Sequence, residues 1–326
     1  MKRGLVCIGA LGAVALLGCA PTFSEAVPPG GPKDATYADV GGARLRFVDE
    51  GEGPPVVLIH GFASALDTWR GVMKELTKHH RVLAMDLKGF GWSNRPPGDY
   101  SPQAEAQLVL ALMDQRNIKS AVIVGHSWGS SVALDVALAA PERVTKIVLY
   151  DAWVYEEQLP TTFLWARATG VGEVLFDLFY SERADEKIAR AFYDPKKYVT
   201  ERFVEEVERA LDRPGTVAAA LAAVRGQRFE DVQKRYHELK QPVLLLWGRE
   251  DEVTLLSFGD RLARDLPHAH LLVYPDCGHF PMIEAAGTST DDLLKFLDEP
   301  ASTPASAPAS TAAATTPSPA APEKTP

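Results

Sequence analysis

The clearest candidates for chemistry in this chain lie at positions 125–129, which read Gly-His-Ser-Trp-Gly. This pentapeptide follows an apolar run typical of a buried strand and precedes a stretch with helical spacing of apolar residues. In that context the pattern G-x-S-x-G is typical of a nucleophile elbow, a strained turn that raises a serine hydroxyl above a sheet. Glycines are needed at both ends because a Cβ there would collide with neighbouring backbone. The sequence therefore predicts Ser127 as a nucleophile, with a plain turn as the alternative.

A serine hydroxyl is a poor nucleophile at neutral pH, so it needs a base within hydrogen-bond reach and a carboxylate that orients this base. Over residues 43–297, and most clearly at the elbow, the chain resembles the α/β-hydrolase family, in its lid-bearing branch of esterases, lipases and related hydrolases. Members of that family carry serine, acid and histidine in this order. The resemblance implies that Asp251, in the turn Gly-Arg-Glu-Asp, is the acid and that His279, in Gly-His-Phe, is the base.

Two other carboxylates compete with Asp251 for the role of the acid. Glu250 lies one residue from the position that matches the family's G-x-x-D turn. Asp151 ends the apolar run after the nucleophile helix, where some family members place their acid, and capping of a following helix is its structural interpretation. We favour Asp251 because its whole turn matches the family pattern.

Acyl transfer also requires a group that stabilises the developing oxyanion. The sequence His-Gly-Phe at 60–62 is similar to the family's oxyanion segment, which implies that the backbone N–H of Phe62 acts together with that of Trp128. We expect His60 itself to fix the loop by hydrogen bonding. The stretch that begins at Asp86 resembles the family's D-x-x-G-x-G-x-S segment, and its glycines favour a turn-forming role for that aspartate.

The nucleophile type restricts the reaction, because relatives that open epoxides or displace halide use an aspartate where this chain has Ser127. We predict hydrolysis of a small-molecule carboxylic ester through an acyl-enzyme, with no metal and no organic cofactor. A proline-iminopeptidase-like aminopeptidase is the alternative, because residues 127–130 are similar to its elbow, although HGFAS replaces its HGGPG segment. Carbon–carbon bond hydrolases and acyltransferases share the triad and stay open. A non-catalytic, lipid-anchored binding protein is the alternative from another class, and the complete set of motifs speaks against it.

These motifs need a rigid sheet to position them. The chain alternates short apolar runs with helical stretches, which is typical of an α/β fold with a mostly parallel sheet flanked by helices. Strands with both faces covered are expected at 56–60, 81–87, 121–125, 144–151, 242–248 and 270–274. Helices are expected at 102–116, 129–139, 255–265 and 290–297. Residues 44–49 alternate polar and apolar side chains, which predicts an antiparallel edge strand.

Residues 153–236 break this rhythm, because they show no strand signal and are rich in helix formers and aromatic residues. We predict a helical lid subdomain inserted between two core segments, residues 37–152 and 237–299. An insertion that leaves the carboxyl end of a strand would roof the ligand site of a parallel sheet. Aromatic residues at helical spacing fit a core as well as an apolar pocket, so the acyl group of the substrate stays open.

Charge and cysteine content exclude other classes of protein. A net charge of -9 argues against nucleic acid as a partner, because a polyanion would be repelled. Of the three cysteines, Cys277 alone lies in the expected folded body, so we predict no internal disulfide. No zinc-type spacing of cysteine and histidine occurs in the sequence.

The amino-terminal sequence predicts export. Residues 1–18 combine two early basic residues with an uncharged apolar run, which is typical of a signal peptide. The run ends in Leu-Leu-Gly-Cys, which resembles the lipobox of bacterial lipoproteins and implies lipidation of Cys19 and attachment to a membrane. The neutral Ala20 favours the outer membrane over the inner one. An ordinary secretory signal and an uncleaved anchor are the alternatives.

Two further segments have too few apolar residues for burial to offset the conformational entropy that is lost when a chain becomes ordered. Residues 19–36 are rich in proline, glycine and small side chains, and we predict a disordered tether. Residues 300–326 consist almost wholly of alanine, proline, serine and threonine, and we predict a disordered tail.

Overall fold

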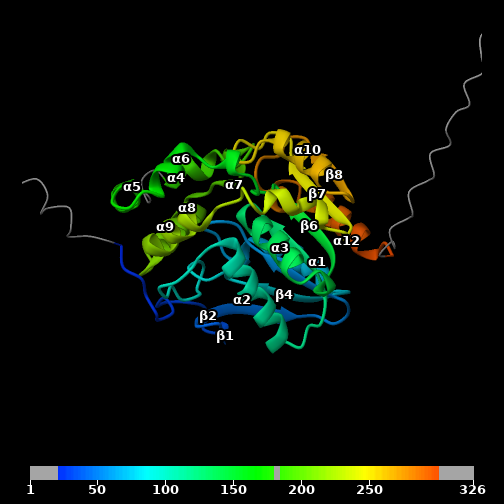
Figure 1. The fold of residues 1–326 in the computed structure, drawn as a ribbon, viewed down its shortest axis with the longest axis horizontal. Coiled ribbons are helices and arrows are strands. Elements are labelled where there is room, and N and C mark those ends of the chain that lie inside the picture. The colour runs from blue at the N-terminus through cyan, green and yellow to red at the C-terminus, as the bar shows by residue number, and fades with distance from the viewer. Residues whose placement is uncertain (1–20, 180–183, 301–326) are drawn as a thin grey trace, which may run out of the picture.

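The computed structural model describes residues 21–179 and 184–300. These residues form one sheet with helices on both of its faces (Figure 1). A further group of helices, labelled α4 to α9 in Figure 1 and formed between residues 161 and 226, lies to one side of this sheet. The predicted signal peptide, the predicted lipidation site Cys19 and residues 301–326 of the predicted tail lie outside the described residues.

The centre of the molecule is an eight-stranded sheet with the order β1-β2-β4-β3-β5-β6-β7-β8. Its strands are β1 (Thr36–Val40), β2 (Ala43–Glu50), β3 (Pro55–Ile59), β4 (Arg81–Met85), β5 (Ala121–His126), β6 (Val144–Tyr150), β7 (Val243–Gly248) and β8 (Ala269–Tyr274). The pairs β1–β2 and β2–β4 are antiparallel, and all other pairs are parallel. Strand β3 lies between β4 and β5, so the chain order reverses there. Open α/β sheets bind ligands at the carboxyl ends of strands at such a point.

The strands predicted from apolar runs are confirmed to within two residues at either end. One expectation is wrong: the strand predicted at 44–49 is antiparallel, but it is not at the edge, because β1 pairs with its outer side. Strand β1 has the sequence TYADV, in which Val40 is the one buried residue. With so little apolar pattern, this strand could not be distinguished from the polar segment before it.

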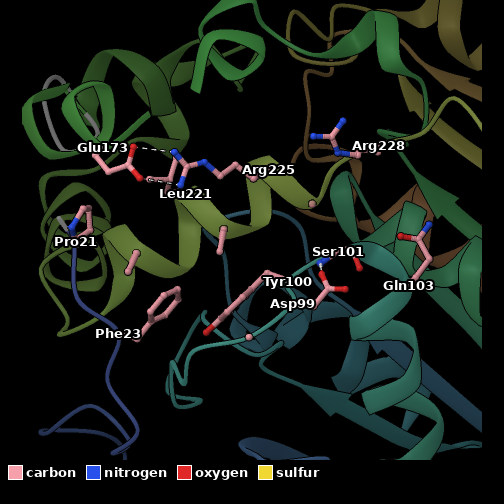
Figure 2. Close-up of a pocket in the computed structure, with 14 residues that line it drawn as sticks. Pro21, Phe23, Asp99, Tyr100, Ser101, Gln103, Glu173, Leu221, Arg225 and Arg228 are labelled. Atoms are coloured by element: carbon pink, nitrogen blue, oxygen red, sulfur yellow. Dashed lines mark hydrogen bonds and ion pairs between the residues drawn. The ribbon is translucent and has the colours of Figure 1, made fainter. Parts of the chain in front are cut away.

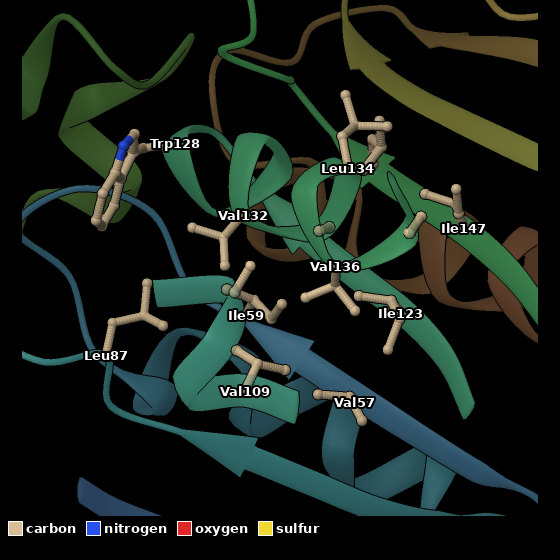
Figure 3. Close-up of a cluster of buried hydrophobic side chains, with 14 of the residues drawn as sticks. Val57, Ile59, Leu87, Val109, Ile123, Trp128, Val132, Leu134, Val136 and Ile147 are labelled. Carbon is tan, nitrogen blue, oxygen red and sulfur yellow. The ribbon is translucent and has the colours of Figure 1, made fainter. Parts of the chain in front are cut away.

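Successive side chains of a central strand point to opposite faces of the sheet, and both faces are covered by helices. Most residues of such a strand are therefore apolar. In β3, Val57 and Ile59 belong to the core that contains α3 (Figure 3), whereas Val56 and Leu58 belong to the core on the opposite face. All four side chains are 0% exposed. Burial of such a side chain contributes about 1.5–3 kcal/mol, so both layers of helices hold the sheet in place.

The helices that cover the sheet lie between successive strands in the sequence or follow the last strand. They are α1 (Arg70–Leu76), α2 (Pro102–Gln115), α3 (Trp128–Ala139), α10 (Leu256–Asp265), α11 (Pro281–Glu284) and α12 (Ala286–Asp298). The start of α2 shows why the boundary lies there: Ser101 Oγ accepts a hydrogen bond from Ala104 N–H, and Pro102 occupies the first helical position. Helix α1 was not predicted, because its seven residues are too few for a clear period.

Between β6 and β7 the described residues form the helical insertion predicted from the sequence (Figure 1). Its helices are α4 (Thr161–Ala166), α5 (Val171–Phe179), α6 (Ala184–Ala189), α7 (Pro195–Tyr198), α8 (Glu201–Leu211) and α9 (Thr216–Gly226). Ala166, Phe176 and Leu221 form a small apolar cluster of its own, which packs against Phe62 and Phe163. The insertion therefore meets the core at the segment expected to hold the oxyanion.

The segment before β1 differs from the free tether expected over residues 19–36. The backbones of Ser24 and Arg95 exchange two hydrogen bonds of 2.8 Å each. Phe23 stacks on Tyr100 with ring centroids 5.9 Å apart, and Asn94 Nδ2 donates to the Glu25 carbonyl. From residue 21 onward, the segment is therefore attached to the body through partners about seventy positions away, which its own composition does not reveal.

Across residues 21–179 and 184–300, no helix has the length and apolar character needed to cross a membrane.

Candidate active site

Ser127 occupies a strained turn between β5 and α3. Its φ of +52° and ψ of −125° lie in a region that residues other than glycine rarely adopt. Its N–H donates to the Tyr150 carbonyl at 2.9 Å, and its own carbonyl accepts from Trp153 N–H at 3.1 Å. Bonds on both sides thus hold the strained residue in place, which is the geometry of a nucleophile elbow.

The two glycines of the elbow are required by close backbone approaches. A Cβ on Gly125 would lie 2.5 Å from the Gly129 carbonyl oxygen. A Cβ on Gly129 would lie 2.3 Å from the His60 carbonyl oxygen. Both distances are far below van der Waals contact, so the steric reason predicted for this pattern is confirmed.

The predicted acid and base lie in contact at the carboxyl ends of β7 and β8. His279 Nδ1 is 2.8 Å from Asp251 Oδ2, and the two residues are 5% and 3% exposed. A carboxylate oxygen accepts, so Nδ1 carries the proton, and the other ring nitrogen, Nε2, is left with a lone pair. An imidazole in this state can act as a general base.

The Asp251 carboxylate has enough donors to stay ionised although it is buried. Burial opposes its charge, but His279 and the hydroxyl and N–H groups of Thr254 together lower the pKa of Asp251 below its ordinary value. Its Oδ1 accepts from Val253 N–H at 2.7 Å and from Thr254 N–H at 3.0 Å. The negative charge that orients the imidazole is thus stabilised by the turn that carries it.

Thr254 is a site residue that the sequence did not indicate. Its Oγ1 donates to Asp251 Oδ2 at 2.6 Å and lies 3.4 Å from His279 Nδ1. Trp247 Nε1 donates to the Thr254 carbonyl at 2.8 Å and fixes the end of this turn. A threonine three positions after the acid is the signal that could have identified it, because a short side chain at that spacing reaches back to a carboxylate.

His126, which lies at the variable position of the elbow, connects the elbow to the histidine loop. Its Nε2 lies 2.8 Å from the His279 carbonyl oxygen, and the two imidazole rings are 4.8 Å apart. Burial lowers the pKa of His126 to about 3, so its ring is neutral. Ser127 Oγ forms no hydrogen bond with any side chain in the described parts of the chain.

The predicted oxyanion segment lies directly against the nucleophile. A Cβ on Gly61 would be 3.0 Å from Ser127 Cβ. In the hydrogen bonds of the described backbone, the N–H groups of Phe62 and Trp128 have no acceptor, so both are free to donate. His60 fixes the loop as expected: Nδ1 donates to the Gly61 carbonyl at 2.7 Å, and Nε2 accepts from Leu87 N–H at 2.9 Å.

Three other acidic residues considered from the sequence have different environments. Asp151 Oδ1 accepts from Gly248 N–H at 2.9 Å, and Glu250 Oε2 accepts from Cys277 N–H at 3.1 Å. Asp86 accepts from Leu66 and Trp92 N–H groups and contacts Arg46, which fits a structural role in its turn. Among the carboxylates considered as the acid, Asp251 is the one that forms a hydrogen bond with His279.

The model of the alpha/beta hydrolase family matches residues 56–290 of this chain, a span that includes the elbow, the acid turn and the histidine loop. The chain belongs to the alpha/beta hydrolase family. The predicted fold is confirmed, and the chain is a hydrolase.

Hydrolases with different named activities are among the proteins to which this chain is similar. The 2-hydroxymuconate semialdehyde hydrolase of Pseudomonas sp. (strain CF600) is 30% identical over 289 residues, which cover 83% of this chain and 96% of that protein. The meta-cleavage product hydrolase CumD of Pseudomonas fluorescens IP01 is 28% identical and superposes with a TM-score of 0.69, covering 80% of this chain and 97% of that chain. A thermophilic esterase from Thermogutta terrifontis is 25% identical with a TM-score of 0.70, covering 81% and 98%.

Aromatic side chains form a connected group that includes Trp128 of the elbow. Phe62 lies 6.3 Å from the ring of Trp128 and 5.6 Å from that of Phe163, which stacks on Trp153 at 6.0 Å. The indole N–H groups of Trp128 and Trp153 are buried and have no acceptor among the described residues. The neighbourhood of the elbow is therefore predominantly apolar.

The hydrolase also has a groove of about 570 Å³ that does not include Ser127. It lies between α9, the start of α2 and the amino-terminal segment, where Pro21 and Phe23 form one wall (Figure 2). An ion pair between Glu173 and Arg225, with 2.8 Å between Oε2 and Nη2, closes its upper end in Figure 2. The groove is separate from the elbow, so we assign it no part in the chemistry.

His126, Asp151 and His279 are the described residues closest to a metal-binding arrangement, with one ligand atom of each within 4.8 Å of the others. Their hydrogen bonds argue for another use: His279 Nδ1 binds Asp251, and His126 Nε2 binds the His279 carbonyl. These nitrogen atoms are therefore engaged in hydrogen bonds with other residues of the site.

Proposed function

We propose that this hydrolase cleaves carboxylic esters by a serine mechanism. The observation that carries the proposal is the strained elbow at Ser127, whose neighbour His126 has its ring 4.8 Å from that of His279, the residue that binds Asp251. These are the groups that acyl transfer needs: a nucleophile raised from the sheet, a base with a free nitrogen and a carboxylate that orients the base.

In the proposed reaction, Ser127 Oγ attacks the ester carbonyl while His279 Nε2 takes the hydroxyl proton. The oxyanion accepts hydrogen bonds from the N–H groups of Phe62 and Trp128. His279 then gives the proton to the leaving alcohol, and an acyl-enzyme remains on Ser127. A water molecule, deprotonated by His279, attacks this acyl-enzyme and releases the acid. Asp251 keeps the proton of His279 on Nδ1 throughout.

The surroundings of Ser127 favour an uncharged, apolar acyl group. The side chains around it are aromatic, and the buried cations of the described residues have other partners, as Arg46 does with Asp67 and Lys146 with the carbonyl of Phe296. An anionic substrate would lose its hydration in such a pocket without gaining a counter-charge. The similarity to the Thermogutta terrifontis esterase supports an ester as the substrate.

Hydrolysis of a carbon–carbon bond is the second candidate. It is favoured by the 30% identity to 2-hydroxymuconate semialdehyde hydrolase over nearly that protein's whole length. The proposed serine, base and oxyanion groups could also attack a ketone, in which case a carbanion would take the place of the alcohol as leaving group.

Two assays test these proposals. A fluorophosphonate probe should label the wild-type protein but not Ser127→Ala, and this variant should lose about 10³-fold or more in kcat while its thermal unfolding stays unchanged. The substrate class follows from kcat/KM for p-nitrophenyl esters of graded chain length, 2-hydroxymuconate semialdehyde and a prolyl-anilide aminopeptidase substrate. Highest kcat/KM for an ester supports our proposal, and highest kcat/KM for the semialdehyde or the anilide replaces it. Normal labelling of Ser127→Ala would exclude the serine mechanism.

We also propose that the mature protein is held on a membrane by lipidated Cys19, on the outer membrane rather than the inner one. The lipobox-like sequence and the neutral Ala20 motivate this proposal, and acyl chains anchor a protein because each buried methylene adds about 0.8 kcal/mol. Pro21 borders the lid at the groove described above, and the lid helices α4 and α5 expose large apolar side chains such as Trp165, which is 59% exposed. Such a surface suits contact with lipid.

Membrane fractionation of wild type and Cys19→Ser, together with mass spectrometry of the amino terminus, tests the anchor. We expect an acylated Cys19 in the outer-membrane fraction for wild type and a soluble or uncleaved product for the variant. A soluble wild-type protein with an unmodified amino terminus would exclude the anchor and would leave the serine mechanism unaffected.

A further inference from the structure

Asp151 is a buried carboxyl group beside the site that the proposed mechanism does not use. It follows β6 directly, just as Asp251 lies in the turn that follows β7, and these two strands are parallel neighbours. Asp151 and Asp251 therefore both lie at the carboxyl ends of the parallel strands, on the same side of the sheet. Asp151 is 0% exposed, so its carboxyl group has no contact with bulk solvent.

The backbone of Asp151 is fixed next to the acid turn. Its N–H donates to the Leu246 carbonyl at 3.0 Å, and its carbonyl lies 3.1 Å from Thr254 Oγ1. The same Thr254 oxygen is 2.6 Å from Asp251 Oδ2, so its single proton goes to this shorter contact. The φ of Asp151 is +43°, a left-handed conformation that aspartate tolerates better than most residues. The position of Asp151 is thus tied to that of Asp251.

The two side-chain oxygens of Asp151 have unequal environments. Oδ1 accepts from Gly248 N–H, but Oδ2 is buried and receives no hydrogen bond from the described residues. An ionised carboxylate in this state would be a buried charge with half of its acceptors unused. One oxygen with a donor and one without fits a neutral carboxyl group, in which Oδ2 carries the proton.

The charges around Asp151 point the same way. Burial, and after it the charge of Asp251, raises the pKa of Asp151 well above its ordinary value, and Glu284 of α11 adds to the rise. The Gly248 N–H acts in the opposite direction. His126 is neutral, and the proton on His279 Nδ1 is directed to Asp251.

We propose that Asp151 is a positioning residue that keeps its proton and donates a hydrogen bond from Oδ2 to the Asp251 carboxylate. This inference rests on the proposed roles of Asp251 and His279. Asp251 acts on the carboxyl group of Asp151 through its charge and its side chain. Thr254 Oγ1 contacts the Asp151 carbonyl and the Asp251 side chain, and Asp251 itself already binds His279. With a further donor, its charge is spread over more partners.

This hydrogen bond has a consequence for the base. A carboxylate that accepts a further hydrogen bond attracts the His279 proton less strongly, so the imidazolium form is stabilised less. Loss of the Asp151 donor should move the acid limb of the rate profile to higher pH, because that limb reports the base of the free enzyme.

Infrared difference spectroscopy tests the proton directly, without any assay of activity. We expect the C=O stretching band of a protonated carboxyl group in wild-type protein near neutral pH and its loss in Asp151→Asn. Glu105→Gln is the matched control, because Glu105 is a second fully buried carboxyl group, on α2 and outside the proposed site. The control should lose a different band. If the spectra of wild type and Asp151→Asn agree in this region, Asp151 is ionised and the proposal is wrong.

The pH dependence of kcat/KM tests the hydrogen bond. Asp151→Asn keeps an N–H donor and should retain kcat/KM within about threefold, whereas Asp151→Ala should lose about tenfold and shift its acid limb upward. A loss in Asp151→Asn as large as that of Asp251→Asn would make Asp151 an ionised acid instead. An unshifted acid limb in Asp151→Ala would leave it a purely structural residue.

The two proposals can fail separately. If the fluorophosphonate probe does not label wild-type protein, the serine mechanism fails, while the infrared band still decides the protonation of Asp151. If labelling is normal but the band is absent, the positioning role fails on its own.

Discussion

The imidazole Nε2 of His126 lies 2.8 Å from the carbonyl oxygen of His279. A carbonyl oxygen accepts, so this nitrogen must carry a proton, and the bond joins the residue before the proposed nucleophile to the proposed base. The backbone N–H of His279 in turn donates to the Ala191 carbonyl of the lid at 2.7 Å. The histidine loop is therefore held between the elbow on one side and the insertion on the other.

From this relationship we predict that His126→Ala lowers kcat for ester hydrolysis by about 10- to 100-fold, because a displacement of about 1 Å at a reacting group costs on this order. Burial holds the pKa of His126 at about 3, so the loss should be equal at all pH values at which the enzyme works. His237→Ala, at an exposed histidine, should leave kcat unchanged. A loss that varies with pH would show that His126 titrates in the reaction.

The acid turn offers a matched pair of carboxylates. We predict that Asp251→Asn lowers kcat by about 10⁴-fold, because an amide in this place favours the wrong tautomer of His279. Glu250→Gln should stay within about threefold of wild type, since the Gln oxygen can still accept from Cys277 N–H. Steady-state kinetics on one ester measures both variants. Equal losses would mean that neither residue has the specific role of orienting the base.

The parts of the site that could be predicted from the sequence are those encoded by neighbouring residues. The elbow pattern is visible in five consecutive residues: the missing side chain of Gly125 avoids the Gly129 carbonyl four positions away, although that of Gly129 avoids the more distant His60 carbonyl just after β3. The central strands are apolar on both faces, and this pattern is visible in a few residues. Asp251 and His279 followed from turns that match a known family.

The parts that could not be predicted depend on contacts between distant segments. Thr254 acquires its role from the position of His279, which lies 25 residues further along the chain. Phe23 and Ser24 occur in a segment whose composition indicates disorder, and they are ordered by Tyr100 and Arg95. The substrate also depends on such contacts, because the walls around Ser127 come from the core and from the lid.

Two glycines provide a stability test of the elbow. We predict that Gly129→Ala prevents folding or lowers the free energy of unfolding by several kcal/mol, because its Cβ would lie 2.3 Å from the His60 carbonyl oxygen. A Cβ on Gly71, on helix α1, would meet nothing within 4 Å. Gly71→Ala should therefore raise the free energy of unfolding by about 0.5–1 kcal/mol. Chemical denaturation measures both. A stable Gly129→Ala variant with normal activity would refute the close packing at the elbow.

The last prediction concerns the pH dependence of stability and rests on Glu105. This residue is 0% exposed; burial raises its pKa from 4.5 to about 8, although Lys88 acts against the rise. A pKa that is higher in the folded than in the unfolded state means that the folded protein binds more protons between these two values. The contribution of Glu105 to stability is therefore complete below about pH 4.5 and is lost as pH rises towards 8.

We expect the ionisation of Glu105 alone to lower the free energy of unfolding of wild type by up to about 5 kcal/mol over this window, since one pKa unit corresponds to about 1.4 kcal/mol. Glu105→Gln cannot ionise, and its amide oxygen can still accept from Lys88 N–H, so its stability should decline much less. Asp135, whose pKa burial raises to about 7, remains in both proteins and leaves a smaller slope of the same sign. Urea denaturation at several pH values measures the difference. Parallel curves for the two proteins would show that Glu105 is ionised in the folded state.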